Sequence, residues 1–378
     1  MSDEFVVDNP RSERVKRVAQ LATRAGRRKQ GKFLAEGPQP VREALRLWLR
    51  TWESPDVNAA SQQRIPAQYA PQEYLPALEA LYFDPAALER HPGVASLLDQ
   101  VRGTLFDPQR ELPPEARLFL REATEEVLAA MGDAETSQGI LAVCRPPAIQ
   151  FEGLDSLLVG MRETTVWAAE DGTSTAGTIV DYAPVRLAPV LVRLQDPGNV
   201  GTLIRVADAA GAGVVVLTPG STDPWAPKVV RAAAGSHFHI PVATGIDLDQ
   251  LTTFVRENGA QVLAADGYAA TSLAELQLQE ESSASLLHPT YWLLGNEAHG
   301  LSDHEGALAD YGVAIPLYGQ AESLNVALAG ALCLYASAIA QRSAPEAQVP
   351  QTLPPTGHEE YAPLSALTEH PFERGGTR

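Results

Sequence analysis

Three segments of this chain place polar residues directly after apolar, strand-like runs. They span residues 194–205, 294–302 and 315–326, and each puts Gly, Asn, Ser or Glu where a buried strand should end. Asn, Ser and Glu supply hydrogen-bonding groups, and Gly lets a ligand approach the backbone. Because ligands of open α/β sheets bind at the carboxyl ends of the strands, the three segments predict one shared ligand site.

The first segment predicts a turn followed by a helix. Pro197-Gly198 makes the turn, Asn199 is a good helix N-cap, and Arg205 lies six residues further on. Gly201 lets another backbone approach closely. The apolar neighbours of Arg205 indicate a buried helix, in which a guanidinium group needs a carboxylate or a phosphate as partner. A capped helix with a surface arginine is the alternative.

The second and third segments offer polar groups at two further strand ends. Gly295 exposes backbone groups, and Asn296 and Glu297 add polar anchors; an ordinary loop with an exposed acid is the alternative. Ser323 and Asn325 stand at the start of a long apolar helix, which Ser323 can cap. Because that helix is almost wholly apolar, we expect its N-terminus to point into the structure rather than to solvent.

From residue 187 onward, strands and helices alternate regularly. This pattern predicts an α/β domain at residues 187–342, with a mostly parallel sheet that is covered on both faces. Gly211 stands where a helix C-cap belongs. The expected strands are residues 187–194, 214–218, 239–243, 261–265, 291–294 and 312–316. The expected helices are residues 200–210, 228–235, 248–258 and 325–341.

A smaller α/β domain is expected at residues 1–147, with an inserted loop at about 51–76 that is rich in Pro, Gln and Ser. Residues 148–186 form a linker or flap, long enough to contain a strand pair. Residues 343–378 are rich in Pro, Glu, Thr and Ser and are predicted to be a disordered tail. Helices are expected in the smaller domain at residues 11–25, 40–50, 76–82, 84–100 and 115–131, and a strand at 139–143.

The net charge of −18 is unusual for a nucleic-acid binder, but the charge is unevenly distributed. Residues 1–50 hold 12 Lys and Arg against 6 Asp and Glu, a net charge of +6. A basic arm on an acidic body can still hold phosphates; a solvated, flexible N-terminus is the alternative. The candidate phosphate-binding residues are Arg24, Arg27, Arg28, Lys29 and Lys32.

The remaining side chains indicate neither a metal site nor a disulfide. Cys144 and Cys333 lie far apart without partners at ligand spacing, so we expect two buried, small apolar residues. His237 and His239 have no third ligand and are expected to be ordinary strand residues. Residues 1–10 are unlike a secretory signal and the apolar stretch 326–340 is too short for a membrane span, which predicts a cytoplasmic protein.

Taken in order, the three polar segments resemble motifs 1, 2 and 3 of the SpoU (TrmH-like) family of RNA ribose 2′-O-methyltransferases. Residues 223–236 resemble the stretch that the family has between motifs 1 and 2. Residues 27–37 and 135–142 are similar to the start and end of the ribosomal-protein-like substrate-binding domain that precedes many SpoU catalytic domains. Several matches in the expected order make the resemblance specific.

The resemblance implies a SPOUT catalytic domain with a C-terminal trefoil knot, a homodimer, and S-adenosylmethionine as methyl donor. It implies transfer to a ribose 2′-hydroxyl of structured RNA, ribosomal RNA in preference to transfer RNA. The basic N-terminal residues would then grip RNA phosphates. The implied cofactor contacts are Thr218, Gly295, Asn296, Ile315, Leu317 and Leu324. The implied catalytic positions are Asn199, Arg205, Glu297, Ser323 and Asn325.

Several alternatives stay open at this point. Arg205 is either the base that removes the hydroxyl proton or a phosphate clamp that positions the hydroxyl. Ala327 stands where the family often has Ser, so one polar contact is missing. A SpoU-like RNA-binding protein without activity, a dehydrogenase-like enzyme, and a methyltransferase acting on a base are the rival classes. The motif residues argue against the first, and the missing Gly-x-Gly-x-x-Gly spacing argues against the second.

Overall fold

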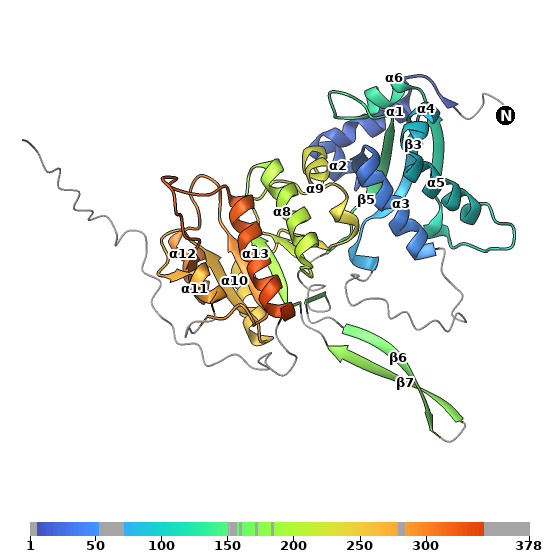
Figure 1. Ribbon diagram of the computed structural model, residues 1–378. Helices are drawn as coiled ribbons and strands as arrows, with labels where there is room; N and C mark the ends of the chain where they lie inside the picture. The colour runs from blue at the N-terminus through green and yellow to red at the C-terminus, as the bar shows by residue number, and fades with distance from the viewer. Residues whose placement is uncertain are drawn as a thin grey trace, which may run out of the picture.

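The computed structural model describes residues 6–52, 72–149, 151, 157–158, 161–170, 173–182, 185–278 and 284–343. It contains two main sheets, one within residues 6–145 and the other within residues 187–314, each with helices packed around it (Figure 1). Most of the expected insert and nearly all of the expected disordered tail lie outside the described residues.

The first sheet is mixed and has five strands. They are β1 (Val6–Val7), β2 (Phe33–Glu36), β3 (Ala77–Phe83), β4 (Phe119–Ala123) and β5 (Ile140–Arg145), in the spatial order β1-β4-β3-β5-β2. β5 runs antiparallel to both of its neighbours, whereas β1, β4 and β3 are parallel. The helices in this part are α1 (Glu13–Ala19), α2 (Arg24–Gln30), α3 (Pro38–Trp52), α4 (Pro85–Arg90), α5 (Pro92–Leu105) and α6 (Glu125–Met131).

Two of the helices expected here are wrong in whole or in part. Residues 76–82 form most of β3, and residues 115–131 contain β4 before α6. The sequence of β3 is rich in Ala, Leu and Glu, which locally favour a helix. In the fold, β3 pairs on both sides, with β4 and with β5. Tertiary pairing therefore overrides local propensity at this strand.

The second sheet has seven strands, and each of its pairs is parallel, as predicted. The strands are β8 (Leu187–Leu191), β9 (Val215–Leu217), β10 (Val242–Thr244), β11 (Gln261–Ala265), β12 (Thr271–Ser272), β13 (Thr290–Leu294) and β14 (Tyr311–Ala314), in the order β10-β9-β8-β13-β11-β14-β12. The helices are α8 (Pro197–Ala210), α9 (Pro227–Ala233), α10 (Leu248–Glu257), α11 (Leu273–Gln277), α12 (Asp303–Ala307) and α13 (Val326–Ser343).

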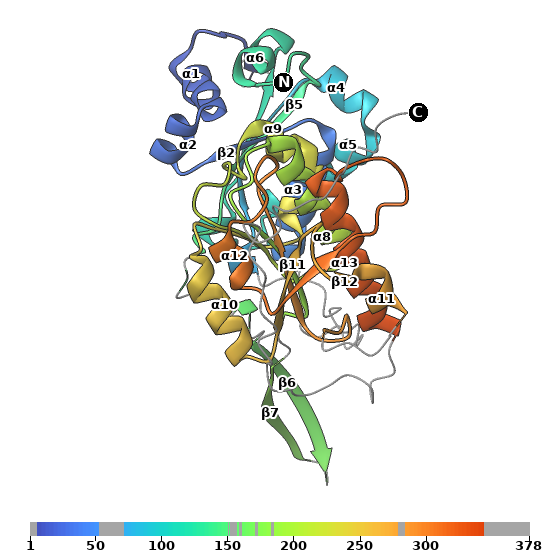
Figure 2. The ribbon, with the colours of Figure 1, turned by 90° about the vertical axis from the view of Figure 1, so that its left-hand side faces the viewer.

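Helices cover both faces of this sheet. Alternate residues of a strand point to opposite faces, and here both sets are apolar and buried. Trp292 and Leu294 of β13 belong to the core beneath α8, α9 and α13, whereas Tyr291 and Leu293 belong to the core beneath α10. Figure 2 shows α10 and α12 on one side of the sheet and α11 and α13 on the other. By length and composition alone, α13 could cross a membrane, contrary to expectation. One of its faces, however, packs on α8, β8 and β13.

The start of α8 differs from the sequence expectation by three residues. The helix begins at Pro197, and its N-cap is Asp196, whose carboxylate accepts a hydrogen bond from the Asn199 backbone N–H at 2.8 Å. Asn199 is therefore not the cap, and its side chain can make other contacts. At Gly201, an added Cβ would lie 2.5 Å from the Val229 carbonyl oxygen, so α8 and α9 pack closely, as predicted. Gly211 ends the helix with φ 68°, which confirms the predicted C-cap.

The connection between the two sheets contains a strand pair. β6 (Met161–Glu170) and β7 (Thr173–Tyr182) form a two-stranded antiparallel ribbon that pairs with neither main sheet. The ribbon extends away from both halves of the molecule (Figure 1). Residues 148–186 therefore contain a strand pair, and their role as a linker or flap stays a prediction.

An aromatic core and an ion pair join the two halves. The ring of Phe33 on β2 lies 4.9 Å from that of Trp225 and 6.4 Å from that of Phe238, measured between centroids. Nearby, Arg27 of α2 forms an ion pair with Asp223 at 2.7 Å, with its side chain only 7% exposed. The two halves therefore share one buried contact region.

His237 and His239 precede β10, which begins at Val242, so neither lies on a strand. Both lie in the contact region, His237 beside the ring of Phe33 and His239 against Glu43. His237 is fully buried, and burial lowers its pKa to about 4. His239 lies 2.8 Å from Asp208 of α8 and 3.2 Å from Glu43 of α3, and hydrogen bonds to these carboxylates raise its pKa to about 9. Burial alone would raise the pKa of Glu43, but hydrogen bonds from His239 and Arg42 lower it to about 2.

Candidate functional site

The loops after β8 and β13 meet the start of α13 at one edge of the parallel sheet. They line an open cleft of about 850 Å³. The lining residues are Gln195, Asp196, Pro197, Asn199, Asn296, Glu297, Ala298, His299 and Asn325. The structure thus brings residues of all three polar segments into one cleft, as the strand-end argument predicts.

Glu297 is the centre of the hydrogen bonds in this cleft. Its carboxylate accepts from the backbone N–H groups of Gln195 at 3.1 Å and Asp196 at 3.0 Å. The Asn199 amide donates to it at 3.2 Å. Partial burial would raise the pKa of Glu297, but the backbone N–H donors and Asn199 lower it. An ionised Glu297 therefore ties the loop after β13 to the start of α8.

Asn325 connects this group to α13. Its side-chain amide donates to the Asn199 oxygen at 3.0 Å, and its own side-chain oxygen accepts from the backbone N–H of Ala327 at 2.9 Å. Asn325 therefore accepts hydrogen bonds from free backbone N–H groups in the first turn of α13 and caps the helix. The sequence predicted this role for Ser323. Ser323 is exposed and does not line the cleft.

Arg205 is exposed, contrary to the expectation of a buried guanidinium. It lies on α8, six residues after Asn199, and does not line the cleft. Among the described residues, no hydrogen bond or ion pair involves its side chain. The helix is buried through Val200, Leu203 and Ile204 instead. Arg205 can therefore bind an anion that arrives from solvent.

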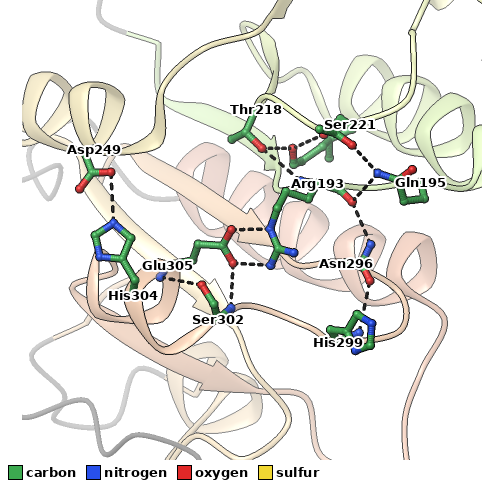
Figure 3. Close-up of polar contacts among 12 residues, drawn as sticks. Arg193, Gln195, Thr218, Ser221, Asp249, Asn296, His299, Ser302, His304 and Glu305 are labelled. Carbon is green, nitrogen blue, oxygen red and sulfur yellow. Dashed lines mark hydrogen bonds and ion pairs between the residues drawn. The ribbon is translucent and has the colours of Figure 1, made fainter.

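Of the six residues expected to contact a cofactor, Asn296 lines the cleft and the other five do not. At Gly295, an added Cβ would lie 2.5 Å from the backbone of Gly300, so the loop itself requires glycine here. The Asn296 amide donates to the Arg193 carbonyl oxygen at 2.9 Å (Figure 3). Thr218 follows β9 and is buried. Ile315 is half-buried, whereas Leu317 and Leu324 are exposed.

Of the basic residues expected to hold phosphates, three are exposed and two form ion pairs within the protein. Arg24, Arg28 and Lys29 are exposed on α2. Lys32 forms an ion pair with Glu79 at 2.6 Å. Arg27 must be removed from the set, because its guanidinium is buried against Asp223 and donates to the carbonyl oxygens of Leu21 and Ala22.

Sequence reasoning missed the exposed cations of α1 and a partly buried ion pair beside the cleft. Arg14 and Arg17 are exposed on α1, the helix that precedes α2. Arg193 forms two hydrogen bonds with Glu305, which also caps α12 (Figure 3). The Ser302-x-x-Glu305 spacing could have indicated the cap, but no local signal indicates the pairing with a residue 112 positions away.

The described residues include no group of three His, Cys, Asp or Glu side chains that could hold a metal ion. Both cysteines are buried and unpaired, as predicted. Burial raises the pKa of the Cys333 thiol to about 12 and that of Cys144 further. Neither thiol is therefore a nucleophile at neutral pH.

Comparison with known proteins finds family matches over both parts of the chain. Residues 186–335 match the SpoU rRNA Methylase family, and residues 12–64 match the MRM3-like substrate binding domain. The chain is 34% identical over 212 residues to the 23S rRNA (guanosine(2553)-2′-O)-methyltransferase RlmP of Bacillus subtilis. This alignment covers 56% of this chain and 69% of that protein. The chain is 31% identical over 250 residues to the 23S rRNA (uridine(2479)-2′-O)-methyltransferase of Streptomyces viridochromogenes, an alignment that covers 64% of this chain and 77% of that protein.

Solved structures agree with the fold. The AdoMet-bound rRNA methyltransferase from Sinorhizobium meliloti aligns with a TM-score of 0.58 and 24% identity, over 88% of this chain and 96% of that chain. The parallel sheet, the cleft at its edge and the sequence matches together lead to one conclusion. This chain belongs to the SpoU rRNA methylase family.

Proposed function

We propose that this protein methylates a ribose 2′-hydroxyl of ribosomal RNA, with S-adenosylmethionine as the methyl donor. The observation that carries the proposal is the hydrogen-bonded group of Asn199, Glu297 and Asn325, one residue from each polar segment, in a single open cleft. The relatives named above act on 23S rRNA, which favours ribosomal RNA over transfer RNA as the substrate class.

The cleft suits a cofactor held mainly by backbone groups. Gly295 follows β13, and Ile315 follows β14, so peptide groups of both loops are available at the sheet edge. We assign the cofactor to Thr218, Gly295, Asn296, Ile315, Leu317 and Leu324. The bound sulfonium supplies an activated methyl group. The protein must then hold the ribose hydroxyl in line with that methyl group and help remove its proton.

Arg205 fits the role of a phosphate clamp better than that of a base. A guanidinium group in contact with water remains protonated, and the side chain of Arg205 is exposed. A protonated arginine binds phosphate oxygens with two parallel hydrogen bonds. Arg205 would therefore position the RNA backbone, while Asn199, Glu297 and Asn325, which line the cleft, surround the reacting hydroxyl.

The region with the first sheet is the proposed RNA substrate-binding domain, residues 1–147. Five of its exposed cations lie on two consecutive helices, Arg14 and Arg17 on α1 and Arg24, Arg28 and Lys29 on α2. Such a surface grips phosphates and supplies affinity rather than sequence choice. An RNA-modifying enzyme of this kind would work in the cytoplasm, where ribosomes are assembled.

A homodimer is the proposed assembly. Leu328, Leu332, Tyr335 and Ile339 lie on one face of α13 and are between 45% and 59% exposed. An exposed apolar stripe of this length commonly marks a protein interface. Sedimentation should therefore report twice the chain mass of 40.5 kDa, and Leu332→Glu should shift it to the monomer. A wild-type monomer at micromolar concentration would contradict this assembly; the predicted trefoil knot stays a prediction.

The deciding experiment transfers labelled methyl from S-adenosylmethionine to total ribosomal and transfer RNA from a strain that lacks this protein. Nuclease mapping of a 2′-O-methyl nucleotide in ribosomal RNA would support the proposal and name the position. Label in transfer RNA alone would overturn the substrate class. Neither transfer nor cofactor binding would favour a SpoU-like RNA-binding protein without activity.

A further inference from the structure

Arg193 has a backbone conformation that residues other than glycine rarely adopt. It follows β8 with φ 53°, in the left-handed region. Its backbone N–H donates to the Thr218 hydroxyl at 3.1 Å, and its carbonyl oxygen accepts from the Asn296 amide at 2.9 Å (Figure 3). Such a conformation persists only where its surroundings hold it in place. Here the partners come from the loops after β9 and β13.

The side chain of Arg193 makes a second link, to the short helix α12 that follows the loop after β13. Its Nε and Nη2 atoms each donate to one oxygen of Glu305 at 2.6 Å. The Glu305 side chain is 14% exposed and also accepts from the backbone N–H of Ser302 at 2.7 Å. Burial opposes ionisation of Glu305, but its hydrogen bonds to Arg193 and Ser302 lower its pKa. A bidentate pair of this kind is among the stronger side-chain contacts.

Two carboxylates between β13 and β14, Glu297 in the loop and Glu305 on α12, therefore hold the loop after β8 at different points. Glu305 holds Arg193, and Glu297 holds the backbone of Gln195 and Asp196. Glu305 does not line the cleft, whereas Glu297 does. Thr218 and Asn296, both assigned to the cofactor, contact Arg193 directly.

We infer that Arg193, paired with Glu305, is a positioning residue that holds the loops after β8, β9 and β13 in the arrangement that binds the cofactor. It acts through Thr218 and Asn296 and does not line the cleft itself. The inference rests on the proposed function, since it concerns the same site. Loss of the pair should therefore weaken cofactor binding and leave the maximal rate of methyl transfer nearly unchanged.

The test uses the full-length protein and compares wild type, Arg193→Gly, Glu305→Gln and the double variant. Glycine keeps the left-handed backbone but removes the guanidinium group, so it separates the ion pair from backbone strain. Calorimetry with S-adenosylmethionine should show a Kd about tenfold higher for each variant, and KM for S-adenosylmethionine should rise equally while kcat stays within about twofold. The double variant should be no weaker than either single variant, because all three lose the same contact.

Two further variants complete the design. Arg193→Lys keeps the positive charge but loses the planar guanidinium that binds both oxygens of Glu305. Its Kd for S-adenosylmethionine should lie between those of wild type and Arg193→Gly. His304 lies beside Glu305 on α12 and forms an exposed ion pair with Asp249 of α10. The variant His304→Ala removes this pair and should bind the cofactor like wild type. Thermal unfolding of each variant identifies any that fails to fold, and Arg193→Lys then carries the test.

The outcomes separate this inference from the proposed function. Wild type that binds no S-adenosylmethionine would remove the proposed function itself. Wild type that binds it, together with an unchanged Kd in Arg193→Gly and Glu305→Gln, would overturn only the positioning role. A fall in kcat without a rise in Kd would overturn it as well.

Discussion

The contact region between the two halves and the cleft at the sheet edge both gather polar side chains, but they hold them differently. In the contact region, charges meet opposite charges, as Arg27 meets Asp223 and His239 meets Glu43. In the cleft, Glu297 and Asn325 are exposed and bonded to backbone and amide groups. Paired, buried charges fix the two halves together, whereas exposed, partly satisfied groups can still bind a ligand.

The largest expected effect is a loss of activity without a change of fold, at Arg205. Arg205→Ala should reduce methyl transfer about 10³-fold, because the phosphate clamp that positions the ribose hydroxyl is lost. Cofactor binding should be retained, because the exposed guanidinium has no structural partner among the described residues. Labelled-methyl transfer and calorimetry measure the two quantities. Arg90→Ala, at an exposed position of α4, is the matched control. Unchanged turnover in Arg205→Ala would refute the assigned role.

Arg27 and Arg28 are neighbours that should behave in opposite ways. Arg27→Ala should lower the free energy of unfolding by about 3 kcal/mol, because it leaves Asp223 partly buried without its partner. Arg28→Ala should leave stability within about 0.5 kcal/mol and weaken RNA binding, since its side chain is exposed. Denaturant unfolding and RNA titration at two salt concentrations measure both. Equal stability of the two variants would contradict the contrast.

Glu297→Gln should reduce methyl transfer about tenfold. Glutamine keeps the shape, but its amide group faces the backbone N–H donors of Gln195 or Asp196, so the loop after β13 loses an anionic anchor. Single-turnover methyl transfer measures the effect. Glu257→Gln, on the exposed end of α10, should retain the wild-type rate. A wild-type rate in Glu297→Gln would mean that the charge of this residue plays no part.

The smallest effect concerns the pH dependence of the contact region. The pKa of His239 is raised from 6.5 to about 9, so its pairing stabilises the fold fully below pH 6.5, and this contribution is lost as pH rises through about 9. Facing groups are Glu43 and Asp208, with Arg42 and Arg46 beside Glu43. The melting temperature should therefore fall between pH 7 and about pH 9.5, and less so in His239→Gln. An equal fall in His239→Gln would assign the loss to other groups.

Local patterns in the sequence determined much of the parallel sheet. Residues 261–265 were predicted as a strand and form β11, and the predicted C-cap at Gly211 is present. The three polar segments were predicted to share a site, and Asn199, Glu297 and Asn325 do so. These predictions succeed because a buried parallel strand is a continuous apolar run, and its end is marked by turn and capping residues.

Only the tertiary structure decided the features that depend on distant partners. β3 is a strand because β4 and β5 pair with it, although its own residues favour a helix. Arg27 is buried by Asp223, which is 196 positions away, and Arg193 is held by Glu305, which is 112 positions away. Arg205 is exposed because α8 buries its other face. Spacing and propensity act over a few residues, whereas strand order and helix packing decide which side chains meet.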